Sequence, residues 1–403
     1  MFSFLTDAPP QRRTLFFGSS MHVWNDLFVA LTVPLLPFIK EDMGLSFTEV
    51  GLLRSVFGGA TAILQIPAGF LAETMGEFWL LVWGNIWVAL GLVAMALSPV
   101  FVVLLITSLV AGLGAGAQHP LASSMVSRAY EDKGRSTAVG TVNFAGDLGK
   151  MIAPIVAGVV AIQFGWRAAL WAVGVAGVIF MMLSMTVRRS VDTARSGRRA
   201  SHETDGAEDN TLMGGFITLS GIGFLDSATR GASLVFLPFV MDAKDMSAVQ
   251  ISAMLFLLFT GGAAGKFVCG WLSDRYGVVN VIWGTKGLTA LLLVVSVWAS
   301  PLAIAPLMLV LGIGLNGTSS ALYATVADFV PAHRRARLYG VYYTTNEGGT
   351  VLAPIVYGLI ADLSSLNITM IVMGLATATI LPASLMLRKY LSSGSATMGG
   401  AEA

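Results

Sequence analysis

The sequence predicts an all-α membrane protein with twelve transmembrane helices arranged as two six-helix repeats. Of its 403 residues, 55% are hydrophobic and only 12% are charged, whereas ordinary soluble domains carry about 25% charged residues. Apolar stretches of about 20 residues, the length that crosses a bilayer, recur along the whole chain. The two halves of the chain also share glycine, proline and acidic positions at a nearly constant offset. Together these observations exclude an ordinary soluble domain.

Polar breaks between the apolar stretches predict the individual helices. The first six are expected at 14–38, 47–73, 78–98, 101–127, 135–162 and 165–187. The second six are expected at 212–240, 247–273, 279–299, 302–328, 335–362 and 366–387. One long polar segment lies between the two sets, and its composition is typical of a linker without a packed core. We therefore expect an N-terminal half at 1–187, a linker at 188–211 and a C-terminal half at 212–403.

The distribution of basic residues predicts the orientation. If the N-terminus is cytoplasmic, seventeen lysines and arginines, Lys286 among them, fall on the inner side. Only Lys40, Arg54, Arg167 and Lys244 fall on the outer side. This excess follows the positive-inside rule. We expect both termini and the linker to be cytoplasmic and the protein to be a multi-pass component of a bacterial inner membrane.

An offset of 200 residues brings out an internal repeat. Residues 153–156 and 353–356 both read Ala-Pro-Ile-Val, Asp147 falls on Glu347, and Gly149 falls on Gly349. Such a run is unlikely to arise by chance, in contrast to a match of single glycines. Two parallel six-helix repeats are the arrangement of a large class of secondary transporters.

Two loops carry a recognisable signature. Residues 69–76 read Gly-Phe-Leu-Ala-Glu-Thr-Met-Gly, and residues 270–277 read Gly-Trp-Leu-Ser-Asp-Arg-Tyr-Gly. The second resembles the G-x-L-x-D-R-x-G signature of the major facilitator superfamily closely, while the first lacks the arginine. The resemblance covers essentially the whole chain and implies the major facilitator fold. It also implies a conformational latch formed by Gly69, Glu73, Gly76, Gly270, Asp274, Arg275 and Gly277. An ordinary tight turn between helices is the alternative interpretation of these loops.

The fifth predicted helix carries a second pattern. Gly140, Gly149 and the small residues around Pro154 are similar to the G-x8-G-x3-G-P-x-x-G-G signature of proton-coupled antiporters, with alanine at two glycine positions. Together with Asp26 and His119, this pattern resembles bacterial efflux members of the fosmidomycin-resistance and drug-proton antiporter type. The fourth helix lacks the mid-membrane arginine of many drug-proton antiporters, so their coupling scheme is not implied here.

Charged residues within the predicted spans mark the candidate site, because a charge at mid-bilayer costs roughly 2.5–3.5 kcal/mol. They are Asp26, Asp147, Lys150, Asp226, Arg230, Lys266 and Glu347. The resemblance places the first, fifth, seventh and eleventh helices, which carry six of these residues, around a central cavity. Two pairs share a helix face, at spacings of three and four residues, so they either bind a solute or neutralise each other structurally.

Roles follow from this placement. The proton-coupling candidates are Glu347, Asp26 and Asp147, and the first two have no basic neighbour one turn away. The substrate-binding candidates are Arg230, Lys150, Asp226, His119, Asn25, Asn346 and Tyr343. Histidines in a helix bundle often serve packing alone. Two histidines so far apart do not indicate a metal site by their spacing, and we expect neither a metal nor a cofactor.

We therefore expect a secondary active transporter that moves a small anionic or amphipathic organic solute by alternating access. Proton-coupled export is favoured, and proton-coupled uptake of an organic anion is the alternative. A transport-inactive sensor or assembly factor on the same fold is the alternative of another class. The sequence contains no H-E-x-x-H or G-x-S-x-G motif, so we do not expect an enzyme. The expected partners are a small molecule, protons and the lipid bilayer, without nucleic acid, and the chain is expected to be monomeric.

Overall fold

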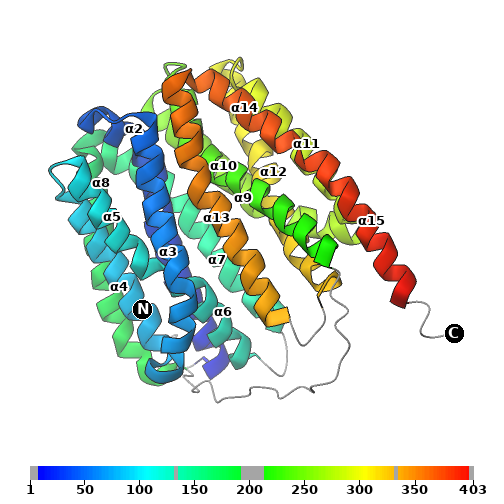
Figure 1. Ribbon diagram of the computed structural model, residues 1–403. Coiled ribbons are helices and arrows are strands. Elements are labelled where there is room, and N and C mark those ends of the chain that lie inside the picture. The colour runs from blue at the N-terminus through cyan, green and yellow to red at the C-terminus, as the bar shows by residue number, and fades with distance from the viewer. Residues whose placement is uncertain (1–7, 131–134, 192–212, 331–334, 399–403) are drawn as a thin grey trace. The chain divides into compact units, whose positions relative to one another are not determined.

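The computed structural model describes residues 8–130, 135–191, 213–330 and 335–398 (Figure 1). Within these ranges the regular elements are helices, and no strand occurs. Of the predicted linker, only the first residues are described, and there a short 3-10 helix, η2 (Met185–Ser190), extends the preceding helix. The remainder of the linker lies outside the described residues.

Each predicted span falls on one helix or on consecutive helices of the structure. The N-terminal elements are α2 (Pro10–Met43), α3 (Phe47–Met75), α4 (Glu77–Ala96), α5 (Phe101–Ala115), α6 (Gln118–Ala129), α7 (Arg135–Val156), η1 (Ala157–Ala161) and α8 (Ile162–Ser184). The C-terminal elements are α9 (Met213–Asp242), α10 (Ala248–Tyr276), α11 (Val278–Ser296), α12 (Pro301–Thr325), η3 (Val326–Asp328), α13 (Arg335–Leu363), α14 (Leu366–Ala378) and α15 (Ile380–Met398). The fourth and the last predicted spans are each divided into two helices.

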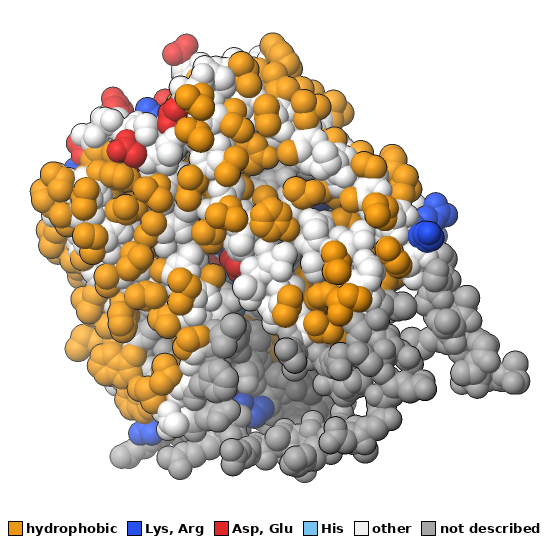
Figure 2. Space-filling view, in the orientation of Figure 1, with side chains coloured by type: hydrophobic (Ala, Val, Ile, Leu, Met, Phe, Trp, Pro, Cys, Tyr) orange, Lys and Arg blue, Asp and Glu red, His pale blue; other side chains and the backbone are white. Residues whose placement is uncertain are grey.

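The outer surface of these helices is apolar, as a membrane protein requires. Eight stretches of the described chain are long and apolar enough to cross a bilayer. Figure 2 shows hydrophobic side chains over much of the visible face, while acidic side chains gather at one end. On α4, for example, Trp83, Trp87 and Leu90 are about half exposed. A soluble protein rarely exposes a continuous apolar surface of this kind, so this surface fits contact with lipid.

The helices form two compact units. The first contains Met1–Leu45, Val56–Ala200 and Ala248–Phe256, and the second contains Ser46–Ser55, Ser201–Ser247 and Leu257–Ala403. The first turns of α3 therefore belong with the C-terminal helices, and the first turns of α10 with the N-terminal ones. Each unit has its own core, with α2, α4 and α6 contributing to the first and α9, α12 and α13 to the second.

The internal repeat reappears as the same backbone contact in each unit. In the first, α2 packs along α7, and a Cβ atom on Gly149 would lie 2.2 Å from the carbonyl oxygen of Val23. In the second, α9 packs along α13, and a Cβ on Gly349 would lie 2.3 Å from the carbonyl oxygen of Phe224. Small residues let membrane helices approach this closely. The glycines shared at the 200-residue offset thus fix the spacing of equivalent helix pairs.

The signature loops use their last glycine for backbone conformation. Gly76 precedes α4 with φ 80° and ψ 147°, and Gly277 precedes α11 with φ 81° and ψ 151°. This region of backbone space is essentially restricted to glycine. Gly270 is not needed for close helix contact, because a Cβ there would meet no atom of the described residues within 4 Å.

The charged residues of the predicted latch are described only in part. The guanidinium of Arg275 is exposed and lies 5.7 Å from the ring centroids of both Trp271 and Tyr276. The side chains of Glu73 and Asp274 lie outside the described residues. Their role in a latch therefore stays a prediction.

Pro154 lies close to a change of helix type. It occupies the last turn of α7, and the π-helix η1 follows directly after Val156. A proline inside a helix lacks the amide donor and collides with the preceding turn, and a widened π turn relieves such a conflict.

Candidate functional site

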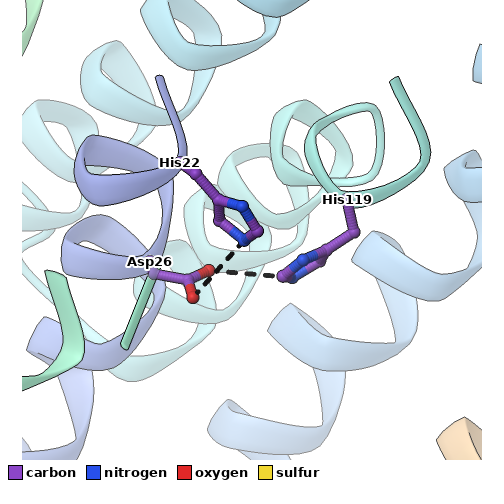
Figure 3. Close-up of side chains that lie close together, drawn as sticks. All are labelled: His22, Asp26 and His119. Carbon is purple, nitrogen blue, oxygen red and sulfur yellow. Dashed lines mark ion pairs between the residues drawn. The ribbon is translucent and has the colours of Figure 1, made fainter. Parts of the chain in front are cut away.

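Asp26 lies at the centre of a charged cluster in the first unit, between α2, α6 and α7. Its Oδ2 atom is 3.0 Å from Lys150 Nζ, which also donates to Asp147 Oδ1 at 3.1 Å. His22 Nε2 lies 3.7 Å from Asp26 Oδ2, and His119 Nε2 lies 3.6 Å from Asp26 Oδ1. Figure 3 shows His22 and Asp26 extending from one helix toward His119 on a neighbouring one. Lys150 therefore bridges the two carboxylates, and both imidazoles face that of Asp26.

The cluster has a buried side and an accessible side. The side chain of Asp26 is only 3% exposed, whereas those of Lys150 and His119 are 33% and 47% exposed. A solute that reaches the cluster meets the ammonium and one imidazole first. With both histidines neutral, the cluster carries one net negative charge, so proton uptake is needed before it attracts an anion.

These contacts correct two expectations about this unit. Asp26 has a basic partner, but Lys150 comes from another helix, which the search for neighbours one turn away could not detect. Asp147 and Lys150 are not a self-contained pair, because the lysine also serves Asp26. Gly146 makes room for the cluster, since a Cβ there would lie 2.5 Å from Asp26 Oδ2 and 2.7 Å from His22 Cδ2.

A chain of amides joins three helices beside the cluster. Asn25 Nδ2 donates to Asn85 Oδ1 at 3.1 Å, and Asn85 Nδ2 donates to Gln118 Oε1 at 3.0 Å. All three side chains are buried. This placement favours a packing role for Asn25, a substrate-binding candidate. Asn85 was missed by the sequence analysis, although a lone asparagine in an apolar helix is a usable signal.

In the second unit, the ion pair of Asp226 is formed with Lys286 on α11 and not with Arg230. Lys286 is fully buried, and its Nζ also donates to the carbonyl oxygen of Gly314 at 2.8 Å. Lys286, counted among the basic residues of the expected inner side, therefore lies in the interior of the second unit. Arg54, counted on the outer side, lies in the second turn of α3. If Lys286 is left out of the inner count of basic residues and Arg54 out of the outer count, the excess of basic residues on the expected inner side remains.

Arg230 and Glu347 belong to a second polar cluster. Arg230 Nη2 donates to Ser227 Oγ at 3.2 Å, and within the described part of the chain it takes part in no ion pair. Glu347 attracts both Arg230 and Arg54 electrostatically. Glu347 has no basic neighbour one turn away on its own helix, but these two cations reach it from other helices. With Asp226 neutralised by Lys286, this cluster carries one net positive charge.

Tyrosines border this second cluster. The ring of Tyr323 on α12 stacks on Tyr343 at 4.7 Å between centroids and meets Tyr342 edge to face at 5.5 Å. Asn346 and Tyr342 are buried beside Gly223, where a Cβ atom would lie 2.4 Å from Asn346 Oδ1 and 2.6 Å from the Tyr342 hydroxyl. The structure thus brings together the candidates Arg230, Asn346, Tyr343 and Glu347 in one unit. Tyr323 was missed, because nothing in its local sequence relates it to the eleventh predicted span.

Comparison with known proteins decides the family. The family model described as Major Facilitator Superfamily matches residues 18–213 and 219–399. The chain belongs to the major facilitator superfamily. It is therefore a member of a family of membrane transporters for small solutes, and the fold expected from the resemblance is confirmed.

Individual relatives of this major facilitator protein are distant but cover most of its length. A fosmidomycin resistance protein of Escherichia coli is 24% identical over 87% of this chain and 86% of its own. A probable 4-methylmuconolactone transporter of Cupriavidus pinatubonensis is 26% identical over 87% of this chain and 84% of its own. A bacterial homologue of the human lysosomal transporter Spinster, crystallised in an inward-facing and occupied conformation, superposes with a TM-score of 0.77. It shares 16% identity over 97% of this chain and 98% of that chain.

Proposed function

We propose that this protein transports a small organic anion across the bacterial inner membrane and that protons drive the transport. The observation that carries the proposal is the state of Arg230. Its potential partner Asp226 is paired with Lys286. Among the described residues, the guanidinium donates to Ser227 Oγ and forms no ion pair, so its other donors can serve a ligand. Arginine presents two parallel donors that fit a carboxylate or phosphonate.

The surroundings of Arg230 support an anionic ligand. Arg54 adds a second cation, Glu347 offsets one of the two, and the net charge of the cluster is positive. Tyr323 and Tyr343 offer stacked rings and hydroxyl donors for the rest of the solute. A compact anion with an apolar or unsaturated body fits this combination of groups.

The proton-coupling role is proposed for the carboxylates Asp26, Asp147 and Glu347. Each lies beside a cation, and protonation of the carboxylate releases that cation for another anion. In the first unit, the accessible Lys150 and His119 would then meet a solute or exchange a proton while Asp26 remains shielded. This mechanism links proton binding to solute binding without a cofactor.

Export is the proposed direction. Gly149 of the antiporter-like pattern on α7 packs on Val23 of α2, the helix that carries His22 and Asp26. The similarity to a fosmidomycin resistance protein points the same way. Uptake with protons is the second candidate. It is favoured by the net negative charge of the Asp26 cluster, which makes proton and anion binding cooperative, and by the similarity to a probable 4-methylmuconolactone transporter.

Proteoliposomes with an imposed pH gradient test the proposal. Radiolabelled carboxylates and phosphonates should move only when a gradient or counter-substrate is present, and the direction of proton movement separates export from uptake. Arg230→Met should abolish anion binding, whereas the matched variant Arg188→Met should not, because Arg188 lies over the Trp79 ring outside the cluster. Transport of cations in preference to anions, or normal anion binding by Arg230→Met, would refute the proposal.

The remaining features of the transporter belong to the same proposal. We expect six-helix halves at 1–187 and 212–403, a cytoplasmic linker at 188–211, cytoplasmic termini and a monomer. The basic residues on the expected inner side support this orientation. The signature residues Glu73, Asp274 and Arg275 are proposed to latch one conformation. A periplasmic reporter fused within the linker should give no signal.

A further inference from the structure

We infer that His22, Asp26 and His119 form a binding site for a divalent transition-metal ion of the zinc type. The side chains come from α2 and α6, and one ligand atom from each lies within 4.8 Å of the other two. Figure 3 shows the three side chains converging on one space. The site shares His119 and Asp26 with the proposed proton cluster, but it does not depend on the identity of the solute. It could not be inferred from the sequence because 97 residues separate the histidines.

The ligand atoms lie near tetrahedral spacing and reach it after side-chain adjustment. Zinc binds imidazole nitrogen and carboxylate oxygen at about 2.0–2.1 Å, which places neighbouring ligand atoms roughly 3.3 Å apart in a tetrahedron. His22 Nε2 lies 3.7 Å from Asp26 Oδ2, and His119 Nε2 lies 3.6 Å from the other carboxylate oxygen, Oδ1. Because one ligand atom from each residue lies within 4.8 Å of the other two, side-chain shifts of up to about 1.5 Å would bring all three to tetrahedral spacing.

The donor set selects the kind of metal. Two imidazoles and one carboxylate suit zinc, cobalt, nickel or copper, whereas magnesium and calcium prefer oxygen ligands alone. Three protein ligands leave a fourth position open. His119 is the most exposed of the three, so the open position lies toward the accessible side of the cluster.

The surroundings of His22 are a second, independent observation at this site. It is 99% buried, and its Nδ1 atom has no hydrogen-bond partner among the described residues. Its Nε2 atom is directed at Asp26, too distant for a strong hydrogen bond. A metal at Nε2 would give this imidazole a strong partner. The missing partner at Nδ1 means that the outer shell is weak, which predicts a labile rather than a permanent ion.

Lys150 is the internal competitor of the metal. Its ammonium lies 3.0 Å from the same Asp26 oxygen that faces His22. When a metal binds, this ammonium must leave Asp26, and Asp147 at 3.1 Å remains as its partner. Because of this competition, removal of the ammonium should strengthen metal binding, an effect that is not expected at a chance surface site.

Cobalt and zinc binding to the purified full-length protein without a polyhistidine tag test the site. Cobalt should give the visible absorption of tetrahedral coordination, with a stoichiometry of one. His119→Gln and His22→Gln should each weaken binding at least about tenfold, since even the loss of an outer-shell partner costs that much. Lys150→Met should tighten binding by about fivefold, because it removes the competing ammonium.

The other two histidines of the sequence, His202 and His333, provide the matched control. Replacement of both by glutamine should leave the cobalt spectrum unchanged. Loss of binding in this control, or unchanged binding in His119→Gln, would overturn the assignment. Weaker binding in Lys150→Met would overturn it as well, and that variant does not depend on replacing a buried ligand.

Discussion

Replacing both residues of the buried ion pair Asp226 and Lys286 should change the stability of the protein little, whereas replacing only one should lower it strongly. Neither side chain reaches the surface, and Lys286 has a second acceptor in the Gly314 carbonyl. Removing one partner of a buried ion pair costs about 3–5 kcal/mol, whereas replacing both by apolar residues is often neutral. We therefore expect Lys286→Met to destabilise the protein strongly and the double variant Asp226→Leu/Lys286→Met to recover most of the loss.

The size of the single-variant loss follows from what Lys286→Met leaves behind. Asp226 stays buried with its negative charge and without its ion-pair partner, which is the situation that costs about 3–5 kcal/mol. Asp226→Leu should be the milder single change, because the lysine keeps the Gly314 carbonyl.

Heat-induced unfolding in detergent, followed by fluorescence-detected size exclusion, measures this double-mutant cycle. The coupling between the two sites is the quantity of interest, because it isolates the pair from its surroundings. Anion binding should persist in the double variant, in contrast to Arg230→Met. A double variant as unstable as Lys286→Met would refute the reasoning.

Three further changes test other parts of the molecule. Arg128 donates to both carboxylate oxygens of the buried Glu77, so Arg128→Lys should lower heat stability by about 1–2 kcal/mol through loss of the second bond; equal stability in the same detergent assay would contradict this. Asp362 accepts from the amides of Phe47 and Thr48 at 2.8 Å. Asp362→Ala should therefore speed hydrogen exchange at these two amides and leave that of Glu49 unchanged, because Ser46 caps it. Glu347→Gln should abolish gradient-driven transport while solute exchange continues, since exchange moves no proton; normal accumulation would shift the coupling role to Asp26.

The fold was largely predictable because it depends on local composition. Apolar length and polar breaks located most helix ends to within about five residues, although α15 continues to Met398, past the predicted end at 387. The repeat predicted equivalent contacts at Gly149 and Gly349. Helix interruptions were harder to predict. The predicted fourth span is divided near Gly116 into α5 and α6, a break that hydropathy does not detect because both pieces are apolar.

The sequence predicted which charged residues belong to the site, but it did not predict which of them form ion pairs with each other. A charged residue within an apolar span is easily recognised in a sequence because its insertion into the bilayer is energetically costly. For this reason the sequence revealed Asp26, Asp147, Lys150, Asp226 and Glu347. Their partners depend on which helix faces lie opposite each other. The assumption that partners lie one turn apart failed for Asp226, whose counter-ion is 60 residues away on α11. Cross-helix pairing requires the packed structure.

The two halves use one framework for different chemistry. Gly149 and Gly349 hold equivalent helix pairs at the same backbone distance, and the acidic position before each is retained as Asp147 or Glu347. The position one turn later differs, since Lys150 in the first half corresponds to Thr350 in the second. In the first half this lysine neutralises carboxylates across α2 and α7, whereas in the second half Lys286 on α11 takes Asp226 away from Arg230. Lys150 leaves the cluster around Asp26 with one net negative charge, whereas in the second unit the cations Arg230, Arg54 and Lys286 outnumber the carboxylates Asp226 and Glu347 by one. The two clusters therefore differ in the sign of their net charge, an asymmetry that suits the proposed coupling of proton and anion binding.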